Sequence, residues 1–237
     1  MNNKNNNNLK LRKGIINWAI KGVLYKAYVA IVLMLAAGRW NWLAGWLYVT
    51  VFLLFDAATA LVVIPRSPDL LIERSRATPG AKKWDKVIMP LASGILPLIS
   101  WIIAGLNQRL AWNPRIGLEL QGIGFILTIL SHALLVWAMG ANAFFSPLVS
   151  IQEERGHTVA AGGPYRYIRH PGYLGAIIFS ISIPILLGSW WAVFPGFVAA
   201  ILFIVRTALE DQTLQEELAG YQEYAGGVKF RLLPGVW

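Results

Sequence analysis

The 237-residue sequence contains no cysteine and few charged residues. Without cysteine, the chain can form no disulfide, bind no metal through a thiolate and use no cysteine nucleophile. Charged residues make up only 14% of the chain and hydrophobic residues 56%, whereas soluble domains are about 25% charged. The composition therefore disfavours an ordinary soluble domain and indicates a membrane protein.

Acidic residues are the scarcer of the two charged kinds. The chain has 21 Lys and Arg against 12 Asp and Glu, which gives a formal net charge of +9. In so apolar a chain, an excess of basic residues is more typical of oriented membrane spans than of nucleic-acid binding. We therefore expect the membrane as a partner and no nucleic acid.

Several apolar stretches reach the roughly 20 residues that a helix needs to cross a bilayer. Within residues 15–140 we expect a transmembrane scaffold of four spans, at 18–38, 42–64, 87–106 and 118–140. Lys21 and Lys26 interrupt the first span, and we expect their side chains to snorkel to the interface.

The N-terminal segment is polar and of low complexity. It begins MNNKNNNN and continues with Lys10, Arg12 and Lys13, so it offers little apolar surface to bury. We expect residues 1–14 to form a disordered polar and basic tail.

The third region, residues 141–237, begins with a polar segment and continues with an apolar stretch at 174–205 that Gly188 and Ser189 divide. This stretch is either a hairpin of two short helices or one span plus a re-entrant helix. Residues 208–224 then predict an amphipathic helix at the membrane surface. The expected fold is all-α and polytopic, with five to six transmembrane helices including a C-terminal helical hairpin.

The distribution of Lys and Arg predicts the orientation of the spans. Basic residues are concentrated in the N-terminal tail and in segments 65–86 and 141–172, whereas the loops between contain only Arg39, Arg109 and Arg115. We expect the N-terminus and both basic segments to face the cytoplasm, together with any cofactor site that these segments form. We expect the chain to lie in the inner or cell membrane.

The densest cluster of polar and aromatic residues runs from His157 to Tyr173. Pro171-Gly172 imposes a turn directly before an apolar helix. His170 and Tyr173 are therefore expected at a helix N-terminus, where unpaired N–H groups suit a carboxylate or another polar ligand group. The alternative is a basic and aromatic belt where membrane meets water, without a ligand.

Arg206 and Glu210 form a second candidate site. They are four residues apart, so they share one helical face at the point where the last apolar helix leaves the membrane. The alternative is an intrahelical ion pair. Asp56 and His132 lie within spans, where ionisable groups are costly, so we expect each to have a partner. The His and Glu residues around His157 match no zinc spacing, and we expect no metal.

The segment from Gly163 to Gly175, GPYRYIRHPGYLG, resembles the Arg-His-Pro-x-Tyr-x-Gly signature of the isoprenylcysteine carboxyl methyltransferase family and its bacterial and phospholipid methyltransferase relatives. An apolar helix-turn-helix follows in the family's order, and after it come Arg206-x-x-x-Glu210-Asp211, Leu214, Tyr221 and Tyr224. Asp211 stands where the family commonly has a second Glu, a departure that keeps the charge. The resemblance covers about residues 142–234.

This resemblance implies S-adenosylmethionine as the cofactor, bound in a cytosol-facing pocket. The positions that match the family's cofactor contacts are Gln152, His157, Thr158, Val159, Ala160, Tyr165, His170, Pro171, Gly172, Tyr173 and Glu210. Arg206 matches an acceptor-binding arginine of the family. These residue types suit the chemistry, because a carboxylate can hold an ammonium or ribose hydroxyl and tyrosine rings attract a sulfonium.

The expected function is methyl transfer from S-adenosylmethionine to a lipophilic acceptor that enters from the bilayer. We expect the acceptor to be a lipid or a lipidated small molecule or peptide, preferably one that carries a carboxylate, as a prenylated cysteine does. An amine, as on a phospholipid headgroup, is the alternative acceptor. The alternative class is a non-enzymatic transporter or assembly protein whose basic loops only set the topology.

Overall fold

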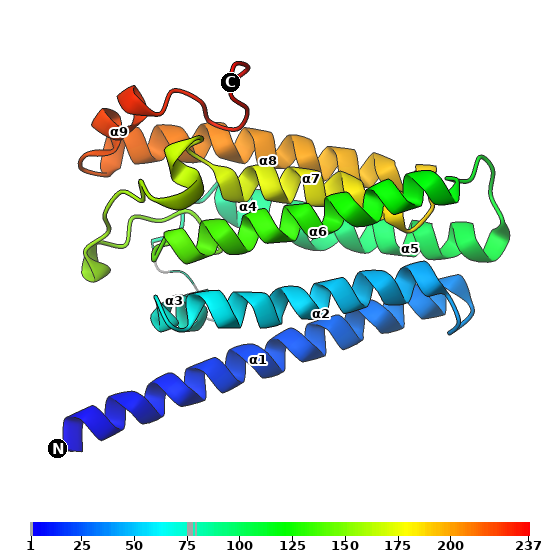
Figure 1. The fold of residues 1–237 in the computed structure, drawn as a ribbon, viewed down its shortest axis with the longest axis horizontal. Coiled ribbons are helices and arrows are strands. Elements are labelled where there is room, and N and C mark those ends of the chain that lie inside the picture. The colour runs from blue at the N-terminus through cyan, green and yellow to red at the C-terminus, as the bar shows by residue number, and fades with distance from the viewer. Residues whose placement is uncertain (1, 75–77, 79) are drawn as a thin grey trace.

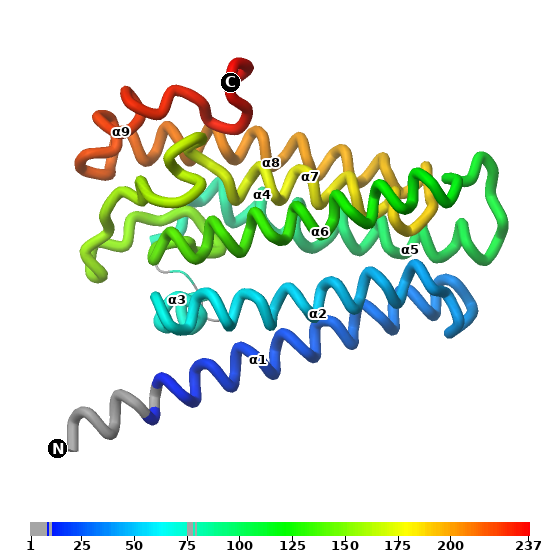
Figure 2. The backbone as a smooth tube through the Cα atoms, viewed as in Figure 1, coloured from blue at the N-terminus to red at the C-terminus, as the bar shows by residue number. Residues whose placement is uncertain are grey.

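The computed structural model describes the backbone of residues 2–74, 78 and 80–237, and their side chains apart from 2–8 and 10 (Figure 2). The described residues form helices and connecting segments and contain no β-strand. The α-helices are α1 (Asn2–Ala37), α2 (Leu43–Val63), α3 (Pro68–Arg74), α4 (Asp85–Pro90), α5 (Leu96–Leu110), α6 (Leu118–Ala141), α7 (Pro171–Leu186), α8 (Trp190–Glu217) and α9 (Tyr221–Gly227). The expected all-α fold is confirmed.

Five helical segments are long and apolar enough to cross a membrane: Leu11–Ala37, Leu43–Val63, Asp85–Leu110, Leu118–Ala141 and Trp190–Glu217. The third combines α4 and α5 through a π-helical turn, Leu91–Ile95, which follows Pro90. Many large hydrophobic side chains on these segments are exposed, as a lipid-facing surface requires. The chain is thus an integral membrane protein, and the predicted spans are confirmed.

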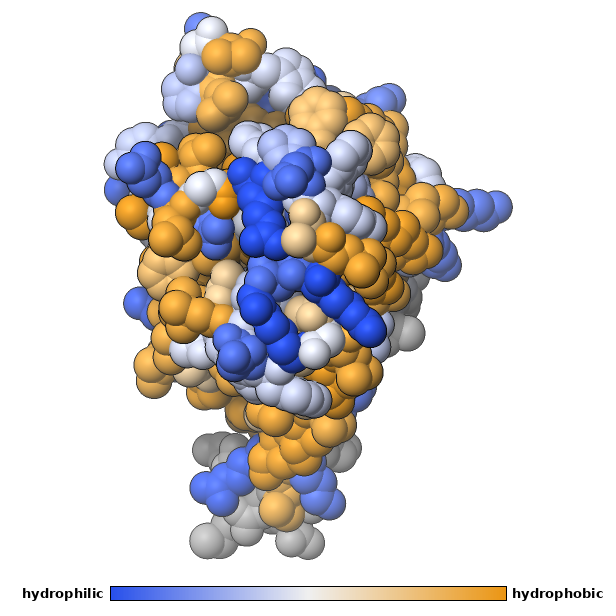
Figure 3. Space-filling view, turned by 90° about the vertical axis from the view of Figure 1, so that its right-hand side faces the viewer, coloured by the Kyte–Doolittle hydropathy of each residue, from blue (hydrophilic) through white to orange (hydrophobic). Residues whose placement is uncertain are grey.

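The segments run back and forth between two ends of the molecule (Figure 1). The N-terminus, the 64–84 segment, the 142–170 segment and α9 lie toward one end, and the short connections around 40, 114 and 188 lie at the other. Figure 3 looks onto this second end, where hydrophilic side chains gather at the centre and hydrophobic ones lie on both sides. The three long polar stretches of the chain therefore meet at a single end.

Helices α7 and α8 form the hairpin that was one of the two interpretations of residues 174–205. The chain reverses at Gly188, which has a φ of +79°, and the Ser189 side chain accepts a hydrogen bond from the Ala192 N–H at 3.3 Å. The two helices pack closely, since a Cβ on Gly196 would lie 2.3 Å from the Ser180 carbonyl oxygen. Small residues at such contacts let membrane helices approach one another.

Two predicted boundaries differ in the structure. Most of residues 1–14, expected to be a disordered tail, belongs to α1, since extending an existing helix costs far less than nucleating one. The amphipathic helix expected at 208–224 is not a separate element: α8 continues to Glu217, and α9 begins at Tyr221 after a turn at Gly220. The left-handed φ of +81° at Gly220 makes this turn.

The ionisable residues inside the spans have partners, as expected. Asp56 accepts a hydrogen bond from Lys26 Nζ at 2.5 Å, and His132 Nδ1 lies 2.7 Å from the Thr128 carbonyl oxygen. The prediction that Lys26 snorkels to the interface is therefore wrong. Its side chain is only 7% exposed, because α2 provides a carboxylate at the same depth.

Candidate active site

A polar cavity lies at the end of the molecule where the long polar segments meet. We call it the loop cavity. Its wall comes from the 142–172 segment, the start of α7, the second half of α8 and α9. Its lining residues are Asn142, Phe144, Phe145, Ser146, Leu148, Val149, Ser150, His157, Thr158, Val159, Ala160, Tyr165, Arg169, His170, Gly172, Tyr173, Arg206, Glu210, Leu214, Leu218, Tyr221 and Tyr224.

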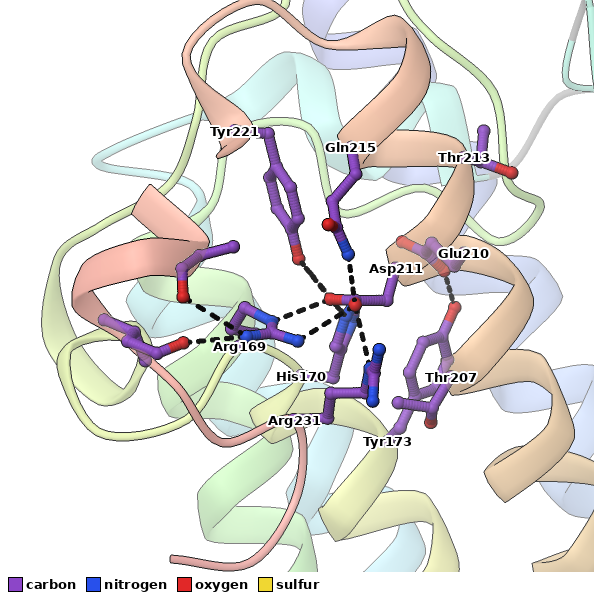
Figure 4. Close-up of polar contacts among 12 residues, drawn as sticks. Arg169, His170, Tyr173, Thr207, Glu210, Asp211, Thr213, Gln215, Tyr221 and Arg231 are labelled. Carbon is purple, nitrogen blue, oxygen red and sulfur yellow. Dashed lines mark hydrogen bonds and ion pairs between the residues drawn. The ribbon is translucent and has the colours of Figure 1, made fainter. Parts of the chain in front are cut away.

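Asp211 on α8 is the centre of a hydrogen-bonded cluster beside this cavity (Figure 4). Its carboxylate is fully buried. Side chains from four segments converge on its two oxygens: Arg169 Nε at 2.7 Å and Nη2 at 2.9 Å, His170 Nε2 at 3.0 Å, Gln215 Nε2 at 2.8 Å, Tyr221 Oη at 3.0 Å and Arg231 Nε at 2.8 Å. Burial, and secondarily the charge of the Asp211 carboxylate, raise the pKa of the Tyr221 hydroxyl.

The Asp211 cluster fixes the Arg-His-Pro motif against the C-terminal segment. The Arg169 and His170 backbone N–H groups donate to the Phe230 and Arg231 carbonyls, both at 2.9 Å. The Arg169 guanidinium also donates to the Val228 carbonyl at 2.9 Å. His170, predicted to bind the cofactor, therefore lines the loop cavity with a ring whose Nε2 is already held by Asp211.

Tyr173 and Glu210 form a second pair on the neighbouring face of α8, separate from the Asp211 cluster (Figure 4). The Tyr173 hydroxyl donates to Glu210 Oε2. The Tyr173 ring is stacked on that of His170, with centroids 5.7 Å apart, and the Arg206 guanidinium carbon lies 5.0 Å from its centroid. One aromatic ring thus carries a cation on its face and a carboxylate at its hydroxyl.

Arg206 pairs with a carboxylate on another helix. Its Nε and Nη2 donate to the two oxygens of Asp85 at 2.6 and 2.8 Å, and Nη2 also donates to the Pro147 carbonyl at 2.8 Å. Asp85 accepts the Val149 N–H as well, at 2.6 Å. The alternative prediction of an intrahelical pair between Arg206 and Glu210 is therefore wrong, because the buried Asp85 occupies the guanidinium fork.

His157 lies where the 142–172 segment folds back on itself. Its ring stacks on Phe144 with centroids 4.5 Å apart, and its Nδ1 accepts the Gln152 N–H at 3.3 Å. Burial, and secondarily the nearby Arg155, lower the pKa of His157, so the ring is neutral at pH 7. Burial also raises the pKa of Tyr165, and it raises that of Tyr224 to about 12, so both hydroxyls stay protonated.

The loop cavity brings together ten of the twelve residues that the sequence singled out. Gln152 and Pro171 are not in its wall: Gln152 Nε2 donates to the Phe144 carbonyl at 2.9 Å, and Pro171 is buried as the first residue of α7. The sequence analysis did not identify the cavity's second polar strip, Asn142, Ser146 and Ser150. These three residues are spaced four apart in an otherwise largely apolar stretch directly after a span, which was the signal for them.

A second, apolar cavity of about 510 Å³ lies among the spans; we call it the membrane cavity. Its wall takes side chains from α1, α2, α3, the α4–α5 segment, α6, α7 and α8. They are mainly aromatic and aliphatic and include Tyr48, Phe52, Trp101, Phe179 and Phe203. Phe145 lines both cavities. The membrane cavity therefore approaches the loop cavity at this residue.

Fold and site together describe a polytopic all-α membrane protein with a polar cavity at one end and an apolar cavity among its spans. The model of the isoprenylcysteine carboxyl methyltransferase (ICMT) family matches residues 123–216. Over 63 residues, the chain is 33% identical to the protein-S-isoprenylcysteine O-methyltransferase of Schizosaccharomyces pombe. That match covers 27% of this chain and about a quarter, 24%, of the relative. Residues 123–216 are thus similar to this family, and the resemblance predicted from the motif is confirmed.

Proposed function

We propose that the protein is an integral membrane methyltransferase that uses S-adenosylmethionine to methylate the carboxylate of a lipophilic acceptor, of the prenylcysteine type. The observation that carries the proposal is that one residue, Phe145, lines both cavities. A polar ligand in the loop cavity and an apolar ligand in the membrane cavity would meet there. Methyl transfer between a water-soluble donor and a membrane-dissolved acceptor needs such a meeting point.

The loop cavity fits the cofactor chemically. Ser150 Oγ is buried in its wall and has no hydrogen-bond partner among the described residues, so it is free to bind a polar ligand group. Glu210 supplies a carboxylate for an ammonium or ribose hydroxyl. The Tyr165 ring also lines the cavity, and the face of an aromatic ring attracts a sulfonium cation. The family match supports the same assignment.

We assign cofactor binding to the residues that the motif predicted and that line the loop cavity: His157, Thr158, Val159, Ala160, Tyr165, His170, Gly172, Tyr173 and Glu210. Gln152 acts through His157, whose Nδ1 it fixes. Pro171 acts by starting α7 behind the motif. Both are thus positioning residues and not direct contacts.

When bound, S-adenosylmethionine supplies a methyl group on a positively charged sulfur. A carboxylate with an ordinary pKa near 3.5–4 is already ionised at neutral pH, so the protein needs no general base. The transfer would need no proton acceptor, because an anionic carboxylate and a cationic sulfonium would give a neutral ester and a neutral thioether. What the chain contributes is orientation and exclusion of water. Arg206 can orient the acceptor only through its charge and its Nη1, because Asp85 holds its Nε and Nη2.

We also propose that the loop cavity faces the cytoplasm, where the cofactor is made. The tail and the two basic segments lie at the same end of the molecule, as the positive-inside rule requires of segments on one side (Figure 1). Single cysteines test this cleanly, because the native chain has none. In intact cells, a cysteine replacing the exposed Asn41 should react with an impermeant reagent, and one replacing the exposed Ala161 should not. Labelling of Ala161→Cys from outside would contradict the proposal.

The catalytic proposal is tested with purified protein in detergent or nanodiscs. We expect saturable binding of S-adenosylmethionine, followed by transfer of labelled methyl to a lipophilic acid in a base-labile form, because methyl esters release methanol in base. Base-stable label on an amino lipid would support the amine acceptor instead. Absence of saturable cofactor binding would support the transporter or assembly class.

A further inference from the structure

Arg74, at the end of α3, has its guanidinium in the wall of the membrane cavity. Its Nη1 donates to the Phe145 carbonyl at 3.1 Å, and its guanidinium carbon lies 5.4 Å from the centroid of the Phe145 ring. No described residue accepts a hydrogen bond from its Nε or Nη2. Among the described residues, the side chain is thus held at Nη1 and by stacking, and the nitrogens Nε and Nη2 have no acceptor.

This guanidinium has no carboxylate partner among the described residues, unlike the other buried cations that lie near the cavities. Lys26 has Asp56, Arg169 has Asp211 and Arg206 has Asp85. Burial, and secondarily the charge of Arg206, lower the pKa of Arg74 to about 10, so the group is still a cation at neutral pH. A cation against apolar walls is costly unless an anion joins it.

Arg74 also stands at the junction of the two cavities. Phe145, which it contacts, lines both. The Phe145 ring also touches the proposed cofactor motif so closely that a Cβ on Gly172 would lie 2.5 Å from Phe145 Cε2. An anion paired with Arg74 would therefore lie at the inner end of the membrane cavity, one aromatic ring from the motif.

We propose that Arg74 binds the anionic group of the acceptor, a carboxylate at the end of a lipophilic chain that fills the membrane cavity. This inference rests on the proposed function and assigns its acceptor-binding residue. The Nε and Nη2 edge of a guanidinium matches a carboxylate in a bidentate arrangement. Arg206 cannot present its fork in this way, because Asp85 occupies it. The volume of the membrane cavity, about 510 Å³, lies within the roughly 300–1,000 Å³ of ordinary ligand sites.

The test measures binding of an acid and its matched ester to the full-length protein in detergent, without cofactor. The probes are N-acetyl-S-farnesylcysteine and its methyl ester, which differ only in the carboxylate. We expect the wild type to prefer the acid and Arg74→Gln to lose about 10- to 100-fold of acid affinity while binding the ester normally. Arg66→Gln is the matched control, since Arg66 is an exposed arginine on the same segment. Arg74→Lys, which keeps the charge without the fork, should retain part of the preference.

The assignment would be overturned if the wild type did not prefer the acid or if Arg74→Gln kept the full preference. If the glutamine variant does not fold, an unchanged preference in Arg74→Lys would overturn it. It would also be overturned if phosphatidylethanolamine, but not the acid, displaced the bound probe. The last result would assign the anion to a phospholipid phosphate. Cofactor affinity is measured separately on the same preparations. If the wild type did not bind the cofactor, the proposed function would be contradicted. The ratio of acid affinity to ester affinity tests the role of Arg74 alone.

Discussion

The loop cavity and the membrane cavity differ in how their polar groups are satisfied. In and beside the loop cavity, the buried charges are paired: Asp211 with two arginines and Arg206 with Asp85. In the membrane cavity, the Tyr48 hydroxyl and the Trp101 indole N–H lack a hydrogen-bond partner among the described residues. Paired charges preorganise the loop cavity, in whose wall Ser150 Oγ lacks a partner among the described residues, whereas the apolar wall of the membrane cavity leaves two donors for a ligand to satisfy.

The two cavities also differ in their origin along the chain. All lining residues of the loop cavity except Leu218, Tyr221 and Tyr224 lie within the family-matched residues 123–216. The membrane cavity takes 12 of its 24 lining residues from Tyr25 to Trp101, outside that match. On the proposed function, cofactor binding depends on the shared segment, and acceptor selection depends largely on the part of the chain that is not shared. The following predictions separate folding from ligand binding within the shared segment.

The largest effect is expected for Asp211→Asn, which removes the charge at the centre of the Asp211 cluster. Arg169 would be left buried without its counter-ion, and breaking such a buried pair costs roughly 3–5 kcal/mol. We expect a lower midpoint of thermal unfolding and loss of cofactor binding together. Glu216→Gln, an exposed change on the same helix, is the control and should alter neither. Normal stability of Asp211→Asn would contradict the structural role of the cluster.

Arg206→Lys tests whether Arg206 serves the fold or only the acceptor. Lysine keeps the charge but cannot donate to both oxygens of Asp85 and to the Pro147 carbonyl in the same geometry. We expect the free energy of unfolding to fall by about 1–3 kcal/mol and turnover to fall with it. Loss of turnover at unchanged stability would show instead that the guanidinium acts mainly on the acceptor.

Glu210→Gln separates ligand binding from folding within the shared segment. Glu210 is only partly buried and lies outside the Asp211 cluster, and its described contact is with the Tyr173 hydroxyl. We expect cofactor affinity to fall about five- to 100-fold, equivalent to about 1–3 kcal/mol, with little change in the unfolding midpoint. Equal losses of affinity and stability would place Glu210 in the structural framework.

Glu210 and His170 show how much of this site the sequence could predict. The motif identified both residues, and the turn at Pro171-Gly172 correctly placed His170 at the start of a helix. Local patterns do not reveal contacts between distant residues: Asp85 meets Arg206 across 121 residues, and Arg231 meets Asp211 from the C-terminal segment. For that reason, the sequence did not predict that Asp211 holds the His170 ring or that Asp85 holds the Arg206 guanidinium.

The same limit applies to the spans. Hydropathy located the five long apolar segments, because length and composition suffice for that. It misjudged Lys26, since its partner Asp56 is 30 residues away on another helix. Likewise, no local pattern marked Arg74, which gains its position only when α3 packs beside Phe145. Sequence therefore predicts the scaffold and the motif better than the pairing of charges.

The smallest effect is expected from His157, and it concerns pH. The folded protein holds the pKa of His157 below its ordinary value near 6.5, so folding favours the neutral ring, whose Nδ1 accepts the Gln152 N–H. The stabilisation is thus complete above about pH 6.5 and is lost as pH falls through that value toward the lower folded pKa. We expect a loss of about 1 kcal/mol or less, the worth of one hydrogen bond. His157→Phe keeps a ring against Phe144 but does not titrate. Its unfolding midpoint should therefore fall less steeply between pH 7 and pH 5.5 than that of the wild type, and parallel curves would remove His157 as the source of the pH dependence.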